Sequence, residues 1–241
     1  MIELGVTITG ADDMVDPNLL DDIGREYPFV EWGILFSKSR EGQPRYPTAQ
    51  WREKLYWATN DRGEYYTLAA HLCGKSVEAF LSSWKHFENE VTLGYNAVQF
   101  NFLTAENKDL IFEFAKAEKN TVIVQYSQNT DILLNGMFDE DVPPDLKILL
   151  DASGGRGISW QEAGWPDIPE PWASRYDVGY AGGINVDNVE QTVFELLQQH
   201  KDVEEGFVWI DLESGARTED KFDIDKVLTI LDKVDKAVKE N

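Results

Sequence analysis

The chain has 241 residues, of which 42% are hydrophobic and 12% aromatic, and this composition excludes an intrinsically disordered protein. Its 44 acidic residues against 22 basic ones give a formal net charge of −22, which repels nucleic acids and anionic membranes at long range. We therefore expect a globular protein with neither partner. A small anionic ligand stays compatible with this charge, because exposed charges are screened beyond about 8 Å at physiological salt.

A single cysteine, Cys73, excludes an internal disulfide and a cysteine-based zinc cluster, and it fits a reducing compartment. The first ten residues, MIELGVTITG, lack the basic flank and the long apolar run of a signal peptide. No apolar stretch reaches the roughly 18 residues that a transmembrane helix needs. We expect a cytoplasmic protein, and the sequence leaves its oligomeric state open.

Eight short apolar runs begin about 30 residues apart, a spacing typical of strands that alternate with helices. The predicted strands are 4–8, 30–36, 66–72, 97–102, 122–126, 148–150, 178–181 and 207–212. Apolar residues at i, i+3 and i+4 predict helices in several of the intervals. These helices are 76–84, 108–118, 188–199 and 223–239. Eight such units predict an α/β protein, a closed (β/α)8 barrel that occupies 1–241 as one domain.

The segment 159–175 contains three prolines and three tryptophans and does not have the pattern of a regular helix. In a barrel it follows the sixth strand, at the end where ligand-covering loops lie. Two interpretations stay open, a lid over a ligand and an ordinary packed loop.

Three of the predicted strands run into glycine-containing turns, in ILLDASGGRGISW, DVGYAGGINVDNV and GFVWIDLESGAR. Glycines let backbone N–H groups approach an anion, and the carboxyl ends of parallel strands meet at one rim. This pattern favours a phosphate site at that rim. The alternative is that tight strand-to-helix turns need glycine without any ligand.

Taken in order, these segments resemble the phosphoribosylanthranilate isomerase family, whose members are TIM barrels. The best-matched parts are ILLD with GGRG after it, AGGINVDNV and WIDLESG, and weaker matches are VTITG, RYPTAQ and AVQFN. The resemblance implies an Amadori rearrangement, in which an acid opens the ribose ring of a phosphoribosylamine and a base moves a proton from C2. The implied partner is a small phosphorylated substrate, with neither a cofactor nor a metal.

The resemblance also implies roles for individual residues of this chain. Asp151 matches the general acid on strand six, Arg45 the arginine near the substrate's carboxylate, and Asp211 the strand-eight aspartate. Asn101 stands where the family has a strand-four histidine. The implied phosphate cradle is Gly155, Gly182, Gly183, Ser214 and Gly215.

The main departure from the family lies in the first strand, where Thr9 replaces the catalytic cysteine. A neutral threonine is too weak a base to accept the C2 proton. Alternation along the strands predicts an inward polar set at the carboxyl end. It comprises Thr9, His71, Cys73, Asn101, Gln125, Ser127, Asp151, Asp211 and Glu213.

Three residues of this inward set are candidate bases, namely Cys73, His71 and Glu213. A histidine beside a cysteine can form a base and thiolate pair. The alternatives are a small buried cysteine, a core histidine and a surface carboxylate.

Three functions therefore stand as hypotheses. The first is an isomerase of the phosphoribosylanthranilate isomerase type that acts on a phosphorylated aminosugar. The second is a catalytically silent barrel that binds a phosphorylated ligand. The third is a hydrolase or lyase with Asp151, Asp211 and Glu213 around a metal. The pair Asp12 and Asp13 after the first strand could also hold a divalent cation with Asp151 or Asp211, although its spacing is not diagnostic.

Overall fold

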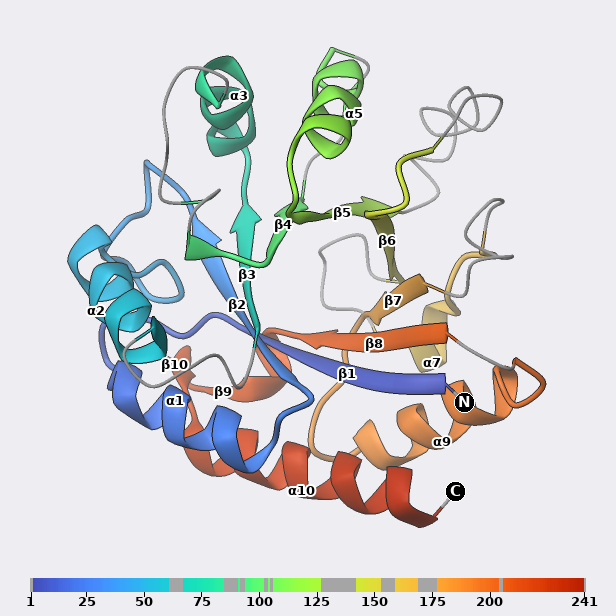
Figure 1. Cartoon of the computed structure of the whole chain (residues 1–241). Helices are drawn as coiled ribbons and strands as arrows, with labels where there is room; N and C mark the ends of the chain where they lie inside the picture. The colour runs from blue at the N-terminus through green and yellow to red at the C-terminus, as the bar shows by residue number, and fades with distance from the viewer. Residues whose placement is uncertain are drawn as a thin grey trace.

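A closed barrel of eight parallel strands forms the centre of the molecule, in strand order β1 to β8. The computed structural model describes residues 2–60, 67–84, 91, 94–101, 104, 106–126, 142–152, 159–168, 177–203 and 206–240. Helices lie around the outside of the barrel (Figure 1). The predicted (β/α)8 fold is confirmed.

The strands agree closely with the predicted runs. They are β1 Ile2–Thr9, β2 Val30–Phe36, β3 Thr67–Leu72, β4 Ala97–Phe100, β5 Thr121–Tyr126, β6 Leu146–Asp151, β7 Asp177–Ala181 and β8 Gly206–Leu212. The barrel closes where β1 pairs with β8, from Ile2 opposite Gly206 to Ile8 opposite Leu212. The strands are rich in apolar residues because the barrel interior covers one of their faces and the helices cover the other.

The helices in the described residues include all four predicted ones. They are α1 Pro17–Glu26, α2 Ala49–Asn60, α3 Lys75–Ser83, α5 Lys108–Ala117, α7 Trp160–Ala163, α9 Val189–Gln199 and α10 Ile224–Glu240. Helix α1 is absent from the predicted helices, although the sequence contains its start signals. Pro17 begins the helix, and the Asp16 side chain caps its first turn by accepting a hydrogen bond from Asn18 N. Helix α2 was also missed, because the exposed Trp57 interrupts its polar face.

The segment 159–175 contains a short helix that its sequence pattern does not predict. Ser159 accepts a hydrogen bond from Gln161 N and caps the short helix α7, which ends at Gly164 with φ +70°. The indoles of Trp160 and Trp165 stack at 4.3 Å. Its described part is therefore a packed turn of helix, and the remainder of the segment lies outside the described residues.

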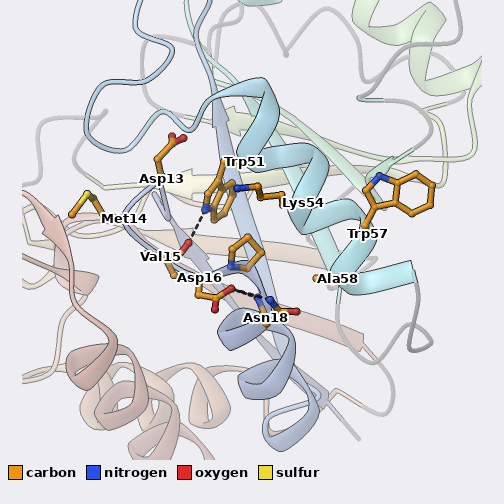
Figure 2. Close-up of a pocket in the computed structure, with 10 residues that line it drawn as sticks. Asp13, Met14, Val15, Asp16, Asn18, Trp51, Lys54, Trp57 and Ala58 are labelled. Carbon is orange, nitrogen blue, oxygen red and sulfur yellow. Dashed lines mark hydrogen bonds between the residues drawn. The ribbon is translucent and has the colours of Figure 1, made fainter.

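A surface hollow of about 630 Å³ lies between α1 and α2, outside the barrel (Figure 2). The Trp51 indole donates to the Val15 carbonyl at 2.7 Å and joins α2 to the loop that precedes α1. Met14 and Trp57 line the hollow and are 82% and 55% exposed. None of the candidate catalytic or phosphate-binding residues lines this hollow.

The apolar core has two parts. The larger lies between the strands and the helices, and the smaller lies inside the barrel. The inner part consists of Ala69, Ala97, Ile123, Leu149 and Trp209. The Trp209 indole packs on Gly179, its register partner on the neighbouring strand β7, where a Cβ would come within 2.2 Å of the indole. We call this inner part the apolar layer, and it separates a carboxyl-end cavity from an amino-end cavity.

No helix in the described part of the chain is long and apolar enough to cross a membrane. The cytoplasmic location stays a prediction.

Candidate active site

The carboxyl-end cavity has a volume of about 350 Å³, within the range of small-molecule sites, which begins at roughly 300 Å³. The apolar layer forms the floor of this cavity, where Leu149 is part of the lining. Polar side chains from six of the strands, or from the residues that follow them, surround it. They are Thr9, His71, Gln99, Asn101, Gln125, Asp151, Asp211 and Glu213.

Two of these carboxylates stand at the same level of the barrel. Asp151 on β6 is opposite Ala181 on β7, and Ala181 is opposite Asp211 on β8. Two strand spacings therefore separate the two aspartate backbones, roughly 9.6 Å. Because the intervening side chain is only a methyl group, open space lies between the two carboxylates.

Among the carboxyl groups that line this cavity, Asp211 has a strongly shifted pKa. Burial raises its pKa to about 7, and repulsion from Glu213 and Glu31 adds to the shift. Hydrogen bonds from Thr9 Oγ1 at 2.9 Å and from Gln99 Nε2 at 3.5 Å oppose it. A carboxyl group with this pKa exchanges protons at neutral pH, as general acids and bases do.

Asp151 lies across the cavity from Asp211 and is nearly buried, at 6% exposure. The Gln125 side-chain amide donates to Asp151 Oδ2 at 2.5 Å. This hydrogen bond fixes the direction of the Asp151 carboxylate.

His71 is buried in the cavity wall, and burial lowers its pKa to about 3. Gln99 Nε2 lies 3.3 Å from His71 Nδ1 and also donates to Asn101 Oδ1 at 2.9 Å. His71 Nδ1 is then the acceptor, which places the ring proton on Nε2. Among the described residues, His71 Nε2 has no hydrogen-bond partner. The ring is neutral at physiological pH and is a weak base.

Room for the His71 ring comes from Gly33 on β2. A Cβ at this position would lie 2.2 Å from Thr9 Oγ1 and 2.9 Å from His71 Nε2. Any larger residue would push both side chains out of place.

Cys73 lies at the edge of this group of residues and is absent from the described lining of the cavity. Burial raises the pKa of its thiol to about 11, so the thiol is protonated at neutral pH. Its Sγ accepts from Asn101 Nδ2 at 3.4 Å, and His71 contributes only its backbone carbonyl, 3.7 Å from Sγ. The predicted pairing of a His71 base with a Cys73 thiolate is disfavoured by this geometry.

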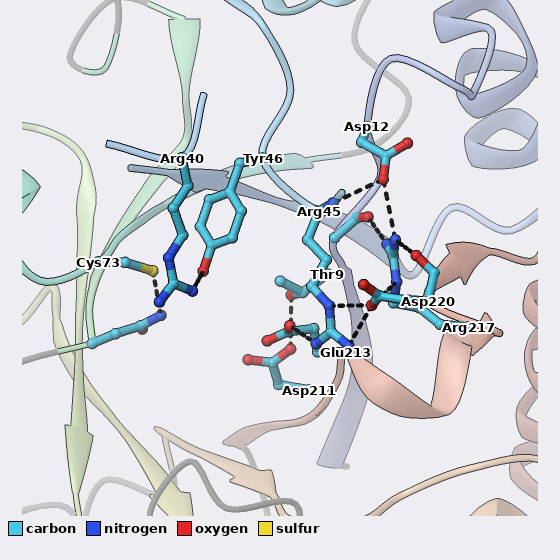
Figure 3. Close-up of polar contacts among 12 residues, drawn as sticks. Thr9, Asp12, Arg40, Arg45, Tyr46, Cys73, Asp211, Glu213, Arg217 and Asp220 are labelled. Atoms are coloured by element: carbon cyan, nitrogen blue, oxygen red, sulfur yellow. Dashed lines mark hydrogen bonds and ion pairs between the residues drawn. The ribbon is translucent and has the colours of Figure 1, made fainter. Parts of the chain in front are cut away.

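Arg45 lies at the rim within a network of charges (Figure 3). Its guanidinium pairs with Glu213 at 2.5 Å and with Asp220 at 2.8 Å. Its backbone, in the left-handed region at φ +77°, donates N–H to Asp12 Oδ2 at 2.8 Å. The buried Arg217 pairs with the same Asp12 oxygen at 3.1 Å. The network ties the loops after β1, β2 and β8 together and holds Glu213 at the cavity wall.

The glycine turns after β7 and β8 line the cavity, and their glycines also have a packing role. Gly183 has φ +64°, and a Cβ there would lie 2.6 Å from Ser159 Cα. A Cβ on Gly215 would lie 2.1 Å from the Ile184 carbonyl oxygen. Gly182, at φ +120°, and Ser214 lie beside them at the cavity wall. The phosphate cradle stays a prediction, and Gly155 lies outside the described residues.

The charged side chains that line this cavity are acidic. Its described lining contains Asp151, Asp211 and Glu213 but neither lysine nor arginine. Among the described residues, no group of three or more histidine, cysteine or acidic side chains is arranged to hold a metal ion. The adjacent Asp12 and Asp13 bind Arg217 and Thr48 respectively.

Sequence reasoning missed Gln99, which lines the cavity, and Gly33, which packs against the lining residues Thr9 and His71. Gln99 precedes the predicted Asn101 by two positions, so the same alternation along β4 identifies it. Gly33 leaves no signal in a single sequence, because its role depends on Thr9 and His71. Ser127, which was expected in the inward set, lies outside the described residues.

No protein-family model matches this sequence, and comparison with curated proteins finds no relative. Solved structures share its fold. N-(5′-phosphoribosyl)anthranilate isomerase from Pyrococcus furiosus superposes with a TM-score of 0.51 at 16% identity, over 97% of this chain and 100% of that one. A monomeric form of the dimeric phosphoribosylanthranilate isomerase from Thermotoga maritima gives 0.57 at 15% identity, over 97% and 99%.

A third similar structure has a different activity in its name. Phospho-2-dehydro-3-deoxyheptonate aldolase from Thermotoga maritima gives a TM-score of 0.54 at 9% identity, over 99% of this chain and 69% of that one. Because one barrel supports many chemistries, likeness at these identities establishes the fold alone.

Proposed function

We propose that this protein is an acid–base enzyme that isomerises a small phosphorylated aminosugar from the aldose to the ketose form. The observation that carries the proposal is the position of Asp211. Its carboxyl group accepts a hydrogen bond from Thr9, the residue that replaces the cysteine of the similar family. A proton acceptor is thereby restored beside the strand-one position, with a pKa of about 7.

In this mechanism Asp151 and Asp211 act from opposite sides of the substrate. The Asp151 carboxyl gives a proton to the ribose ring oxygen, the C1–O bond breaks, and the amine nitrogen forms an iminium with C1. The Asp211 carboxylate then removes the C2 proton, and the C2–H electrons form an enolamine. Tautomerisation of that enolamine, with C1 protonated, gives the ketose, and no external reductant or oxidant is needed.

The remaining residues of the cavity bind and orient the substrate. The amides of Gln99 and Asn101 lie beside Asp211 and suit sugar hydroxyl groups. The turns with Gly182, Gly183 and Gly215 offer backbone at the wall for a phosphate. Arg45 at the rim reaches a substrate carboxylate only by exchanging a partner in its network with Glu213 and Asp220.

One observation favours a second candidate, an acid–base enzyme that cleaves an uncharged glycoside. The described lining has three carboxylates and neither lysine nor arginine, a composition that suits neutral sugars better than phosphates. Glycoside hydrolysis uses two carboxyl groups, one as acid and one as base or nucleophile. Asp151 and Asp211 are the corresponding pair.

The test is turnover of freshly generated phosphoribosylanthranilate, followed by its fluorescence decay, alongside a panel of nitrophenyl glycosides. Asp151→Asn and Asp211→Asn are compared with Asp187→Asn, which changes an exposed aspartate at the same end of the barrel. Decay that both site variants lose and the control keeps supports the isomerase. Release of nitrophenol with the same dependence supports the glycosidase.

The third outcome concerns the silent barrel. If neither substrate turns over while phosphoribosylanthranilate still binds by calorimetry, the catalytic proposal is wrong and a binding function replaces it.

A further inference from the structure

The second cavity of the barrel lies at its amino end and has a volume of about 660 Å³. Trp209 closes its inner side and belongs to the apolar layer. Its lining includes Gly5, Ala97 and Ile123 from the barrel interior. In most barrels this end is filled by layers of branched side chains. Here a cavity large enough for a small organic molecule remains in the described structure.

Two stacked aromatic rings form one wall of this cavity. Phe207 and Trp209, two residues apart on β8, have ring centroids 5.9 Å apart and an interplanar angle of 22°. The Phe207 ring lies over β1 at Gly5, where a Cβ would come within 2.7 Å of it. The missing side chain on β1 therefore lets the ring lie flat and presents an aromatic surface to the cavity.

The two rings already contact one cation, the ammonium group of Lys147. Lys147 Nζ lies 4.8 Å from the Phe207 centroid and 5.9 Å from the Trp209 centroid. The same ammonium pairs with Asp177 at 3.1 Å. Aromatic faces attract cations through their quadrupole. The aromatic wall is thus electrostatically suited to a positive charge.

Glu31 supplies a carboxyl group to the same cavity. Its Oε1 accepts from Thr7 Oγ1 at 2.9 Å and its Oε2 from Thr67 Oγ1 at 3.3 Å. No described basic side chain forms an ion pair with it; burial raises its pKa, and the positive charge of Lys147 partly opposes that shift. Because Lys147, the cation that acts on Glu31, is already paired with Asp177, the Glu31 carboxylate is only partly compensated inside the barrel.

We propose that the amino-end cavity is a second ligand site, which takes a small organic cation with an aromatic body, such as an aralkylamine. The ammonium group donates to Glu31, and the ring packs on Phe207 and Trp209. An aralkyl carboxylate is excluded by repulsion from Glu31, and the uncharged alcohol lacks the charge that Glu31 needs. This site is independent of the chemistry proposed at the carboxyl end, because the apolar layer lies between the two cavities.

The experiment is calorimetric titration with three probes of equal size, benzylamine, benzyl alcohol and benzoate, at neutral pH. Benzylamine is expected to bind at least tenfold more tightly than benzyl alcohol, and benzoate is expected not to bind. Glu31→Gln should weaken benzylamine at least tenfold and remove the preference over the alcohol. The matched control is Glu3→Gln, an exposed carboxylate at the same mouth, which should change binding less than threefold.

A second variant keeps the test valid if Glu31→Gln unfolds. Ala97→Leu fills part of the cavity and leaves every charge in place, so it should abolish benzylamine binding. Asp211→Asn, at the opposite end, should bind benzylamine as the parent does. Equal affinity of the parent for benzylamine and benzyl alcohol, or unchanged benzylamine affinity in Glu31→Gln, would overturn the proposal.

Discussion

The two ends of the barrel are built from the same strands but have opposite characters. At the carboxyl end, β8 contributes Asp211 to a wall of carboxylates and amides that hydrogen-bond to one another. At the amino end, the same strand contributes Phe207 to the aromatic wall of a cavity that Glu31 also lines. A span of four residues on one strand therefore separates a polar site from an aromatic one, with Trp209 between them.

Replacing Asp211 by asparagine is expected to impair catalysis at the carboxyl end and to leave the amino-end cavity unchanged. The amide keeps the size of the side chain and can still bond Thr9, but it cannot take up a proton at neutral pH. We expect kcat/KM to fall about 10²- to 10⁴-fold. Steady-state assays on the substrate identified by the turnover panel measure this, with the melting temperature as the control for folding. A variant that retains more than half of the activity would contradict the role of Asp211.

The pH dependence of stability should also distinguish Asp211. Its folded pKa of about 7 lies above the ordinary aspartate value of 3.8, so the folded state holds the proton more tightly than the unfolded state. This contribution is fully present below pH 3.8 and is lost as the pH rises to 7. A shift of about three units sets a ceiling of about 4 kcal/mol, reduced because the side chain is half-buried.

The measurement is urea unfolding between pH 4.5 and 8 for the parent and for Asp211→Asn. Subtracting the two curves isolates Asp211, because the other titrating groups are shared. A difference that stays flat with pH would show that the carboxyl group is not perturbed in this way.

Glycine positions should separate the polar wall from the apolar layer. Gly33→Ala drives a methyl group against Thr9 and His71, and Gly179→Ala drives one against the Trp209 indole. Each should cost about 1–3 kcal/mol of unfolding free energy. Only Gly33→Ala should also lower kcat/KM, because only it displaces the wall around Asp211.

Denaturant unfolding and activity assays on both glycine variants check this contrast. Adding Trp209→Leu to Gly179→Ala should recover part of the lost stability relative to the sum of the single changes, since the clash is removed. Additive losses in that double variant would argue against contact between the two positions.

Cys73→Ala tests whether the thiol takes part in the chemistry. Because the Cys73 pKa of about 11 keeps the sulfur protonated, we expect kcat/KM to change less than about threefold. A hundredfold loss of kcat/KM would instead support Cys73 as the general base. Alkylation by iodoacetamide gives an independent measure, and it should be slow at neutral pH.

The smallest predicted effect joins the two ends. Glu31 is one of the charges that raise the pKa of Asp211. Glu31→Gln should therefore lower the Asp211 pKa by a few tenths of a unit, roughly the size of a distant charge interaction. Carboxyl-carbon NMR titration of Asp211 measures this directly, and Glu3→Gln serves as the control.

The sequence predicts the barrel well because strand spacing and helix periodicity are local patterns. Asp151, His71 and Asp211 could be placed at one rim by alternation and by strand direction. The hydrogen-bond partners of these side chains could not be predicted, because a contact such as that from Thr9 to Asp211 depends on how the barrel closes. The state of Cys73 was also beyond the sequence, since its acidity depends on burial. The amino-end cavity arises from Gly5, whose role is visible only against Phe207.

The pairing of β1 with β8 has a consequence for how the protein folds. Thr9 and Asp211 are separated by 202 positions, so their contact forms only after almost the whole chain has been brought together. Joining segments this distant carries a loop-closure entropy that neighbouring strands avoid, and contacts of high sequence separation slow folding. Formation of the proton-transfer pair is therefore coupled to the closure of the barrel. Recovery of activity during refolding would report on that closing step rather than on the earlier growth of individual strands and helices.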